Sequence, residues 1–171
     1  MSDTLFSQHS WPQAIVHIDG DAFFTSCEEA IHPELRGKPI ITGGERGIVA
    51  CASYPAKKIG IKRGVPLHEA KKICPGLIVL PSDYETYSLF SRRMFSVMRR
   101  FTDQVEEYSI DEAFADITGM RRALRSSYET IASNMKKEID RAGDYRYRGI
   151  KSHQGVGQNR IETPNTKNQT A

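Results

Sequence analysis

The sequence contains few cysteines and no long apolar run. Its three cysteines, Cys27, Cys51 and Cys74, lie far apart in 171 residues and form no CxxC pair. This pattern favours reduced thiols over a zinc site or a disulfide framework. No stretch approaches the roughly 18 apolar residues that a membrane-spanning helix requires, and residues 1–13 lack the basic and apolar regions of a signal peptide. We therefore expect a cytoplasmic protein with no membrane partner.

The sequence also lacks a basic excess over most of its length. The formal net charge is +3, but residues 1–140 contain 18 basic and 19 acidic side chains, whereas residues 141–171 contain six basic and two acidic ones. The positive charge is therefore a property of the C-terminal segment. An argument for a nucleic-acid partner has to come from local features of the chain and not from its net charge.

Apolar periodicity predicts an α/β (α+β) fold. Strands are predicted at 14–18, 39–42, 47–52, 77–80, 105–108 and 113–117, and helices at 22–31, 55–59, 67–73, 83–101 and about 126–140. This order predicts a sheet domain that is interrupted by a small, mostly helical insertion at 23–82. From residue 143 onward, polar residues and glycine dominate without either period, which predicts a disordered C-terminal tail.

Two acidic clusters follow or precede predicted strands. Asp19 and Asp21 end the first strand, and Asp111 and Glu112 lie in a turn about 90 residues later. If the two strands are neighbours in one sheet, the carboxylates converge at its edge, and carboxylate oxygens are the ligands that Mg²⁺ prefers. Two other interpretations remain open: Asp21 fits the N-cap of the next helix, and Asp111 with Glu112 fits ordinary turn chemistry.

Two further motifs have both a functional and a structural interpretation. Tyr54 and Lys57 lie at the start of a predicted helix, where a hydroxyl and an ammonium group could hold a triphosphate; the alternative is a solvated basic face. Phe23 and Phe24 follow the first acidic cluster. Aromatic residues at a helix start usually belong to the core, but beside a nucleotide one ring could stack on the sugar or block it.

Three strings closely resemble the Y-family DNA polymerases, in particular the DinB/DNA polymerase IV branch. They are HIDGDAFF at 17–24, ASYPAKKIGI at 52–61 and YSIDEAFAD at 108–116, and the resemblance extends over about residues 14–140. It implies a palm with a mixed or antiparallel sheet and packed helices (14–22 and 83–140) around a fingers subdomain (23–82). It also implies a translesion DNA-directed DNA polymerase that acts in DNA repair and transfers nucleotides from dNTP to a primer 3′-hydroxyl on template DNA with two Mg²⁺ ions. Another palm-fold enzyme, such as a nucleotidyl cyclase, is a weaker alternative.

The resemblance assigns a role to each motif residue. The implied catalytic and metal-binding residues are Asp19, Asp111 and Glu112, together with the backbone carbonyl of Gly20; the implied nucleotide-binding residues are Phe23, Phe24, Tyr54 and Lys57. Phe24 occupies the position of the steric gate, the ring that excludes a sugar 2′-hydroxyl. Two residues depart from the family pattern. Lys57 stands where arginine is common and cannot form the bidentate fork to phosphate, and Cys51 stands where a hydroxyl is frequent.

Residues 141–171 do not resemble the family, which continues with a palm strand, a thumb and a little finger. Most amino acids are encoded by several codons, and codons can be chosen for residues 142–161 so that translation one nucleotide later gives a different peptide. That peptide contains Leu-Gly-Ile-Thr-Val, Val-Gly-Leu-Ser-Pro and Lys-Val-Leu-Ala-Lys-Ile-Ala-Ser, in this order. These strings are the expected continuation of the family sequence. We therefore predict a frameshifted tail, a palm sheet that lacks one strand, and no clamp-binding motif for a sliding clamp. For the isolated chain we expect poor stability and negligible polymerase activity. The alternative function is a truncated, inactive remnant that at most binds Mg·dNTP.

Overall fold

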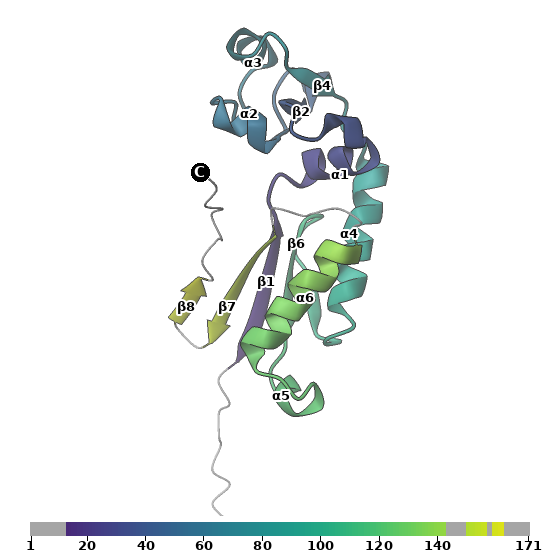
Figure 1. Ribbon diagram of the computed structural model, residues 1–171, viewed down its shortest axis with the longest axis vertical. Coiled ribbons are helices and arrows are strands. Elements are labelled where there is room, and N and C mark those ends of the chain that lie inside the picture. The colour runs from purple at the N-terminus through teal and green to yellow at the C-terminus, as the bar shows by residue number, and fades with distance from the viewer. Residues whose placement is uncertain (1–12, 143–149, 157–158, 163–171) are drawn as a thin grey trace, which may run out of the picture.

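The computed structural model describes residues 13–142, 150–156 and 159–162. Two sheets lie at opposite ends of an elongated molecule (Figure 1). The larger sheet has the strand order β5-β6-β1-β7-β8, and the smaller one has the order β3-β2-β4. No helix in these described ranges is long and apolar enough to cross a membrane.

The larger sheet contains the three strands that the sequence predicts for the palm, β1, β5 and β6, and two further strands from residues 150–162. Its strands are β1 (Ala14–Gly20), β5 (Val105–Glu107), β6 (Glu112–Asp116), β7 (Ile150–Val156) and β8 (Asn159–Glu162). Strand β1 lies between β6 and β7 and pairs antiparallel with both. Along β1, Val16 and Ile18 are fully buried while His17 and Asp19 are half-buried. This alternation gives the sheet one core face and one more open face.

Helices cover the core face of the palm sheet (Figure 1). They are α4 (Tyr84–Met98) and α6 (Tyr128–Ala142), and the short α5 (Met120–Ala123) precedes α6. Helix α1 (Phe23–Ile31) lies between this sheet and the smaller one (Figure 1), and its Phe23 and Cys27 join the same core. In α4, Tyr87, Met94 and Met98 recur at helical spacing and are buried against the strands. Met135 of α6 joins the same core. The amphipathic pattern of the two long helices is therefore satisfied by a single apolar cluster.

The smaller sheet belongs to the fingers. It consists of β2 (Ile40–Thr42), β3 (Cys51–Ala52) and β4 (Ile78–Leu80), accompanied by α2 (Tyr54–Lys58), α3 (Leu67–Ile73) and the 3-10 turns η1 (Pro33–Leu35) and η2 (Gly44–Arg46). Strand β2 pairs parallel with β4 and antiparallel with β3. A separate small core lies beneath these elements, with Ile41, Val49 and Ile61 fully buried. The fingers therefore have their own apolar cluster, independent of the palm core.

The predicted fold class is confirmed, with one shortened strand. The sequence predicts a strand at 47–52, but only Cys51–Ala52 is a strand. The preceding residues turn because Gly43 and Gly47 adopt φ of 95° and 69°, on either side of η2. At Gly43 a side chain is also excluded by space, since a Cβ there would lie 2.6 Å from that of Ala50.

The sequence predicts a palm sheet that lacks one strand and a disordered tail from residue 143, but two segments of that tail form strands of the larger sheet. Strand β7 pairs with β1 from Ala14↔Val156 to Gly20↔Ile150, and β8 pairs in turn with β7. The polar sequence of β7 gave no apolar alternation from which to predict a strand, but ladder formation needs only backbone N–H and C=O groups. The other residues predicted as disordered, 143–149, 157–158 and 163–171, lie outside the described residues.

Candidate active site

Two strands bring the predicted carboxylates to the same end of the palm sheet. Asp19 at the end of β1 is the register partner of Glu112 at the start of β6, so the two side chains project from the same face. The N–H of Gly20 donates to the carbonyl oxygen of Asp111 at 2.8 Å. A Cβ at Gly20 would lie 3.2 Å from the Asp111 Cβ and 3.1 Å from the Phe23 ring. A side chain at position 20 would therefore require these neighbours to shift by a few tenths of an ångström.

Neighbouring side chains hold two of the carboxylates. His17 Nε2 lies 2.7 Å from Glu112 Oε1, and the His17 ring stacks on Phe114 at 4.4 Å with an interplanar angle of 7°. The Ser109 hydroxyl donates to Asp111 Oδ1 at 2.8 Å. Glu112 and Asp111 therefore each have a preferred orientation set by a hydrogen-bond partner.

The donor chemistry of the three carboxylates fits a hard divalent cation. In the described part of the chain, however, no three His, Cys, Asp or Glu side chains are arranged to hold a metal ion as they stand. One oxygen of Glu112 and one of Asp111 already contact His17 and Ser109, respectively. All three residues are half-buried, so each retains some exposure to solvent.

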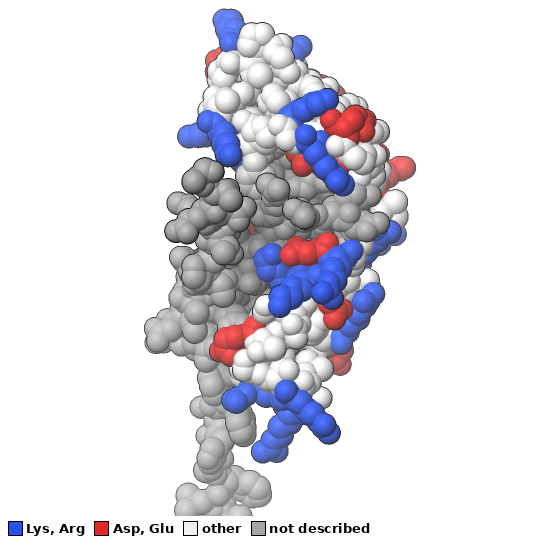
Figure 2. All heavy atoms as spheres, viewed as in Figure 1, with Lys and Arg blue, Asp and Glu red and all other residues white. Residues whose placement is uncertain are grey.

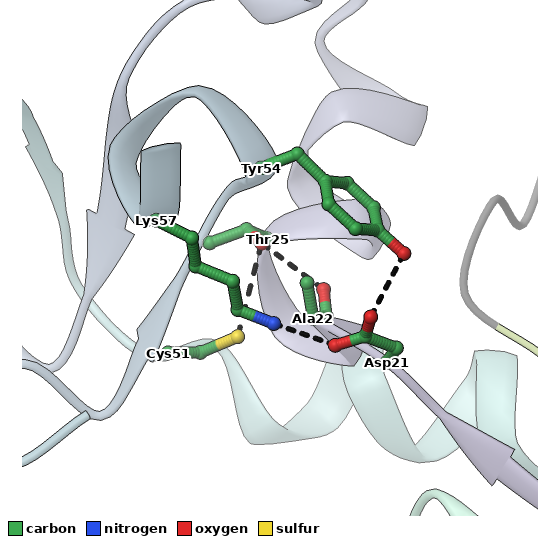
Figure 3. Close-up of polar contacts among 6 residues, drawn as sticks. All are labelled: Asp21, Ala22, Thr25, Cys51, Tyr54 and Lys57. Atoms are coloured by element: carbon green, nitrogen blue, oxygen red, sulfur yellow. Dashed lines mark hydrogen bonds and ion pairs between the residues drawn. The ribbon is translucent and has the colours of Figure 1, made fainter. Parts of the chain in front are cut away.

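Asp21 turns away from the helix that follows it and contacts the fingers. The N-cap of α1 is Ala22, which has φ of 54° and makes no side-chain capping hydrogen bond; the N-cap interpretation of Asp21 is therefore wrong. Instead, the Tyr54 hydroxyl donates to Asp21 Oδ2 at 3.0 Å, and Lys57 Nζ lies 2.5 Å from Asp21 Oδ1 (Figure 3). Tyr54 and Lys57, which the sequence predicts to bind the nucleotide, therefore contact Asp21 in the structure. The sequence does not predict this contact.

The two phenylalanines at the start of α1 have different surroundings. Phe23 is 2% exposed and belongs to the palm core, as the structural interpretation expects. Phe24 is half-buried and its ring stacks on Tyr87 at 4.5 Å with an interplanar angle of 13°. The Tyr84 ring meets Phe24 edge-on at 5.5 Å. Phe24 is therefore held between aromatic side chains of α4.

A buried hydrogen bond supports this aromatic group, and sequence reasoning missed it. The Tyr87 hydroxyl donates to Glu28 Oε1 at 2.6 Å, and both residues are buried. Burial, together with the Glu28 hydrogen bond, raises the pKa of Tyr87 far above its usual range, so the hydroxyl keeps its proton. The one available signal was a glutamate on the buried side of α1, between Cys27 and Ala30.

Cys51 lies on β3 of the fingers and contacts Thr25 of α1. Its Sγ is 3.7 Å from the Thr25 hydroxyl oxygen, which also donates to the carbonyl of Ala22 (Figure 3). The three cysteines are free thiols. Cys51 thus connects β3 to the start of α1 by a weak sulfur contact in place of a hydroxyl hydrogen bond.

Charged side chains are distributed in small groups on the face shown in Figure 2. Lysine and arginine side chains are interspersed with acidic ones over the fingers and over the helical side of the palm. This view agrees with the near balance of 18 basic and 19 acidic residues in positions 1–140. Net charge therefore contributes little to the functional assignment.

Comparisons with known proteins agree with the motifs. The model of the impB/mucB/samB family (IMS) matches residues 18–161, a range that extends beyond the end of the sequence resemblance at 140. DNA polymerase IV of Bacteroides fragilis (strain YCH46) is 42% identical over 127 residues, which are 73% of this chain and 35% of that protein. DNA polymerase IV of Desulfatibacillum aliphaticivorans is 38% identical over 149 residues, 86% of this chain and 36% of that protein.

Solved structures show the same likeness. DinB from Sulfolobus solfataricus superposes with a TM-score of 0.73 at 30% identity, covering 85% of this chain and 42% of that one. An insertion ternary complex of Dbh DNA polymerase gives a TM-score of 0.72 at 29% identity, covering 83% and 42%. The chain spans little more than a third of the length of the two curated relatives. From its motifs, its fold and the family match over residues 18–161, the chain belongs to the impB/mucB/samB family of Y-family DNA polymerase domains.

Proposed function

We propose that this chain provides the palm and fingers of a translesion DNA-directed DNA polymerase. Its reaction would be attack of a primer 3′-hydroxyl on the α-phosphate of a dNTP, with release of pyrophosphate. The observation that carries the proposal is the β1–β6 register, which puts Asp19 opposite Glu112 and hydrogen-bonds Gly20 to Asp111. Carboxylates gathered at one sheet end are what phosphoryl transfer on a template requires from the protein, besides positioning.

The carboxylates of Asp19, Asp111 and Glu112 would hold two divalent ions, with the Gly20 carbonyl as a further ligand. When bound, Mg²⁺ activates the attacking hydroxyl and neutralises the developing charge on the pyrophosphate. The chain's own contribution is orientation: Ser109 and His17 set the starting positions of Asp111 and Glu112. Primer–template DNA would lie across the open face of the sheet.

The nucleotide would be held between the palm and the fingers. Tyr54 and Lys57 would donate to its triphosphate, and Phe23 would support it from the core. Phe24 would act as the steric gate. The stacking of Phe24 on Tyr87 supports this role, because a ring that cannot move aside excludes a 2′-hydroxyl more effectively.

The proposed domain division is palm at 14–22 and 83–140, fingers at 23–82, and a tail at 141–171 translated in a shifted frame. Two segments of this tail, 150–156 and 159–162, add strands β7 and β8 to the palm sheet. The frameshift hypothesis is tested by the nucleotide sequence after codon 141, which must encode the family continuation one nucleotide out of frame. Contacts to DNA phosphates would supply much of the affinity for primer–template DNA.

Titration calorimetry with Mg·dNTP tests the site without requiring catalysis. We expect weak binding by the 171-residue chain and a loss of at least about tenfold in metal-dependent affinity for Asp19→Ala, since even the partners of metal ligands contribute that much. Glu138→Gln, a matched loss of one carboxylate that pairs with Arg100 at 3.6 Å on the helical side, should bind like the unaltered chain. Equal binding by Asp19→Ala would contradict the metal assignment.

Primer extension separates the two candidate functions. Binding without incorporation supports the inactive remnant, which at most binds Mg·dNTP, whereas incorporation by the purified chain supports an active polymerase fragment. Incorporation that survives Asp19→Ala would mean that a contaminant performs it.

A further inference from the structure

We propose that Asp21 competes with the nucleotide triphosphate for Tyr54 and Lys57. In the nucleotide-free chain the Asp21 carboxylate takes the place of a phosphate group, and binding of a triphosphate is an exchange in which Asp21 is displaced. This inference rests on the proposed triphosphate site and adds to it a residue, Asp21, that sets the affinity of that site.

The contacts of Asp21 use both of its carboxylate oxygens. Oδ1 pairs with Lys57 Nζ at 2.5 Å, and Oδ2 accepts from the Tyr54 hydroxyl at 3.0 Å (Figure 3). Lys57 Nζ also lies 5.5 Å from the centre of the Tyr54 ring. An anion thus lies between a hydroxyl donor and a cation, the arrangement that a phosphate oxygen would also satisfy.

The group is accessible to a ligand. The side chains of Lys57 and Asp21 are 40% and 29% exposed. Asp21 lies between β1 and α1, and both of its partners lie on α2. The two contacts therefore connect the end of β1 to α2 of the fingers, and they leave Asp21 and Lys57 partly exposed to solvent.

The chemistry of the two donors makes the exchange necessary. A tyrosine hydroxyl has one proton, so Tyr54 can donate to Asp21 or to a phosphate but not to both. A lysine ammonium has three, so Lys57 could serve both acceptors. A triphosphate beside Lys57 would then face the Asp21 carboxylate at close range, and two like charges about 4 Å apart in water weaken binding roughly fivefold. Asp21 therefore lowers the affinity for an anion at the site that it keeps assembled.

Binding of tripolyphosphate in the absence of metal tests this competition. The probe carries the phosphate chemistry without the base, the sugar or the metal ligands. In the 171-residue chain we expect Asp21→Asn to bind tripolyphosphate about fivefold more tightly, because the amide oxygen still accepts from Tyr54 while the negative charge is gone. Lys57→Gln should weaken binding. Glu138→Gln makes the same change in net charge on the helical side of the palm and should leave binding unaltered.

The outcomes separate this inference from the proposed function. If Lys57→Gln weakens binding while Asp21→Asn binds no more tightly than Glu138→Gln, the competition is refuted and the triphosphate site stands. If Lys57→Gln has no effect, or if no variant binds tripolyphosphate at millimolar concentration, the triphosphate site and the inference fail together. If the contacts of Asp21 only stabilise the fold, Asp21→Asn would lower the midpoint of thermal unfolding without binding tripolyphosphate more tightly. Asp21→Ser, a smaller neutral replacement, repeats the comparison if the asparagine variant does not fold.

Discussion

Removal of the Tyr87 hydroxyl should destabilise the palm by about 2 to 3 kcal/mol. Tyr87 is fully buried and donates to Glu28 Oε1 at 2.6 Å, and Glu28 is 5% exposed. Tyr87→Phe keeps the ring against Phe24 and deletes only this bond. The Glu28 oxygen left behind is buried and has lost its donor, and a buried polar group without a partner costs about 1–3 kcal/mol.

Urea unfolding followed by circular dichroism measures this cost. With a slope of about 1–3 kcal/mol/M for a small protein, the midpoint should fall by about 0.7 to 3 M. Tyr84→Phe is the matched control on the same helix: Tyr84 is 42% exposed, and the change should shift stability by less than about 0.5 kcal/mol. A second control, Tyr87→Phe combined with Glu28→Met, should recover most of the loss, because no buried polar group then lacks a partner. If Tyr87→Phe unfolds within about 0.5 kcal/mol of the unaltered chain, the reasoning is refuted.

Two further changes test other polar contacts. Ser53→Ala should lower the free energy of unfolding by about 2 kcal/mol, because the Ser53 hydroxyl accepts from the N–H groups of Ile40 at 3.0 Å and Ala56 at 3.4 Å. The amide hydrogen of Ile40 should then exchange faster with solvent. Unchanged protection of that amide would contradict the prediction. Asp140→Asn should stabilise the chain at pH 7 but not below pH 4. Desolvation raises the pKa of Asp140 above its ordinary 3.8, despite the Lys136 hydrogen bond, so folding is opposed increasingly as pH rises from 3.8 through the raised value. Thermal midpoints of both chains at several pH values measure the difference, which a pH-independent offset would disprove.

The elements of the palm follow from local sequence patterns. The buried positions of α4 recur every three to four residues, and β1 alternates buried and half-buried side chains over Ala14–Gly20. These patterns span about a dozen residues or fewer, so they can be read without knowing the neighbours. The shortening of β3 could not be read in this way, because an apolar run at 47–52 does not reveal the turn that η2 imposes before it.

The motif residues could be predicted from the sequence, but several of their partners could not. The sequence predicts that Asp19, Asp111 and Glu112 converge if their strands are neighbours, and β1 and β6 do pair, with Asp19 opposite Glu112. The contacts of Asp21 with Tyr54 and Lys57, however, join residues more than 30 positions apart. Nothing in the local sequence of either segment distinguishes an aspartate that caps a helix from one that reaches another subdomain.

By itself, the sequence determined the type and order of most elements, the residues of the motifs and the membership of a family. Only the tertiary structure decided which elements pair, that β7 covers the β1 edge, and that Glu28 holds Tyr87 beneath Phe24. The physical reason is that strand pairing uses backbone N–H and C=O groups, which nearly every residue has. Side-chain packing in addition joins residues that are distant in the sequence and come into contact only when the intervening chain has folded back. Local patterns carry neither kind of information.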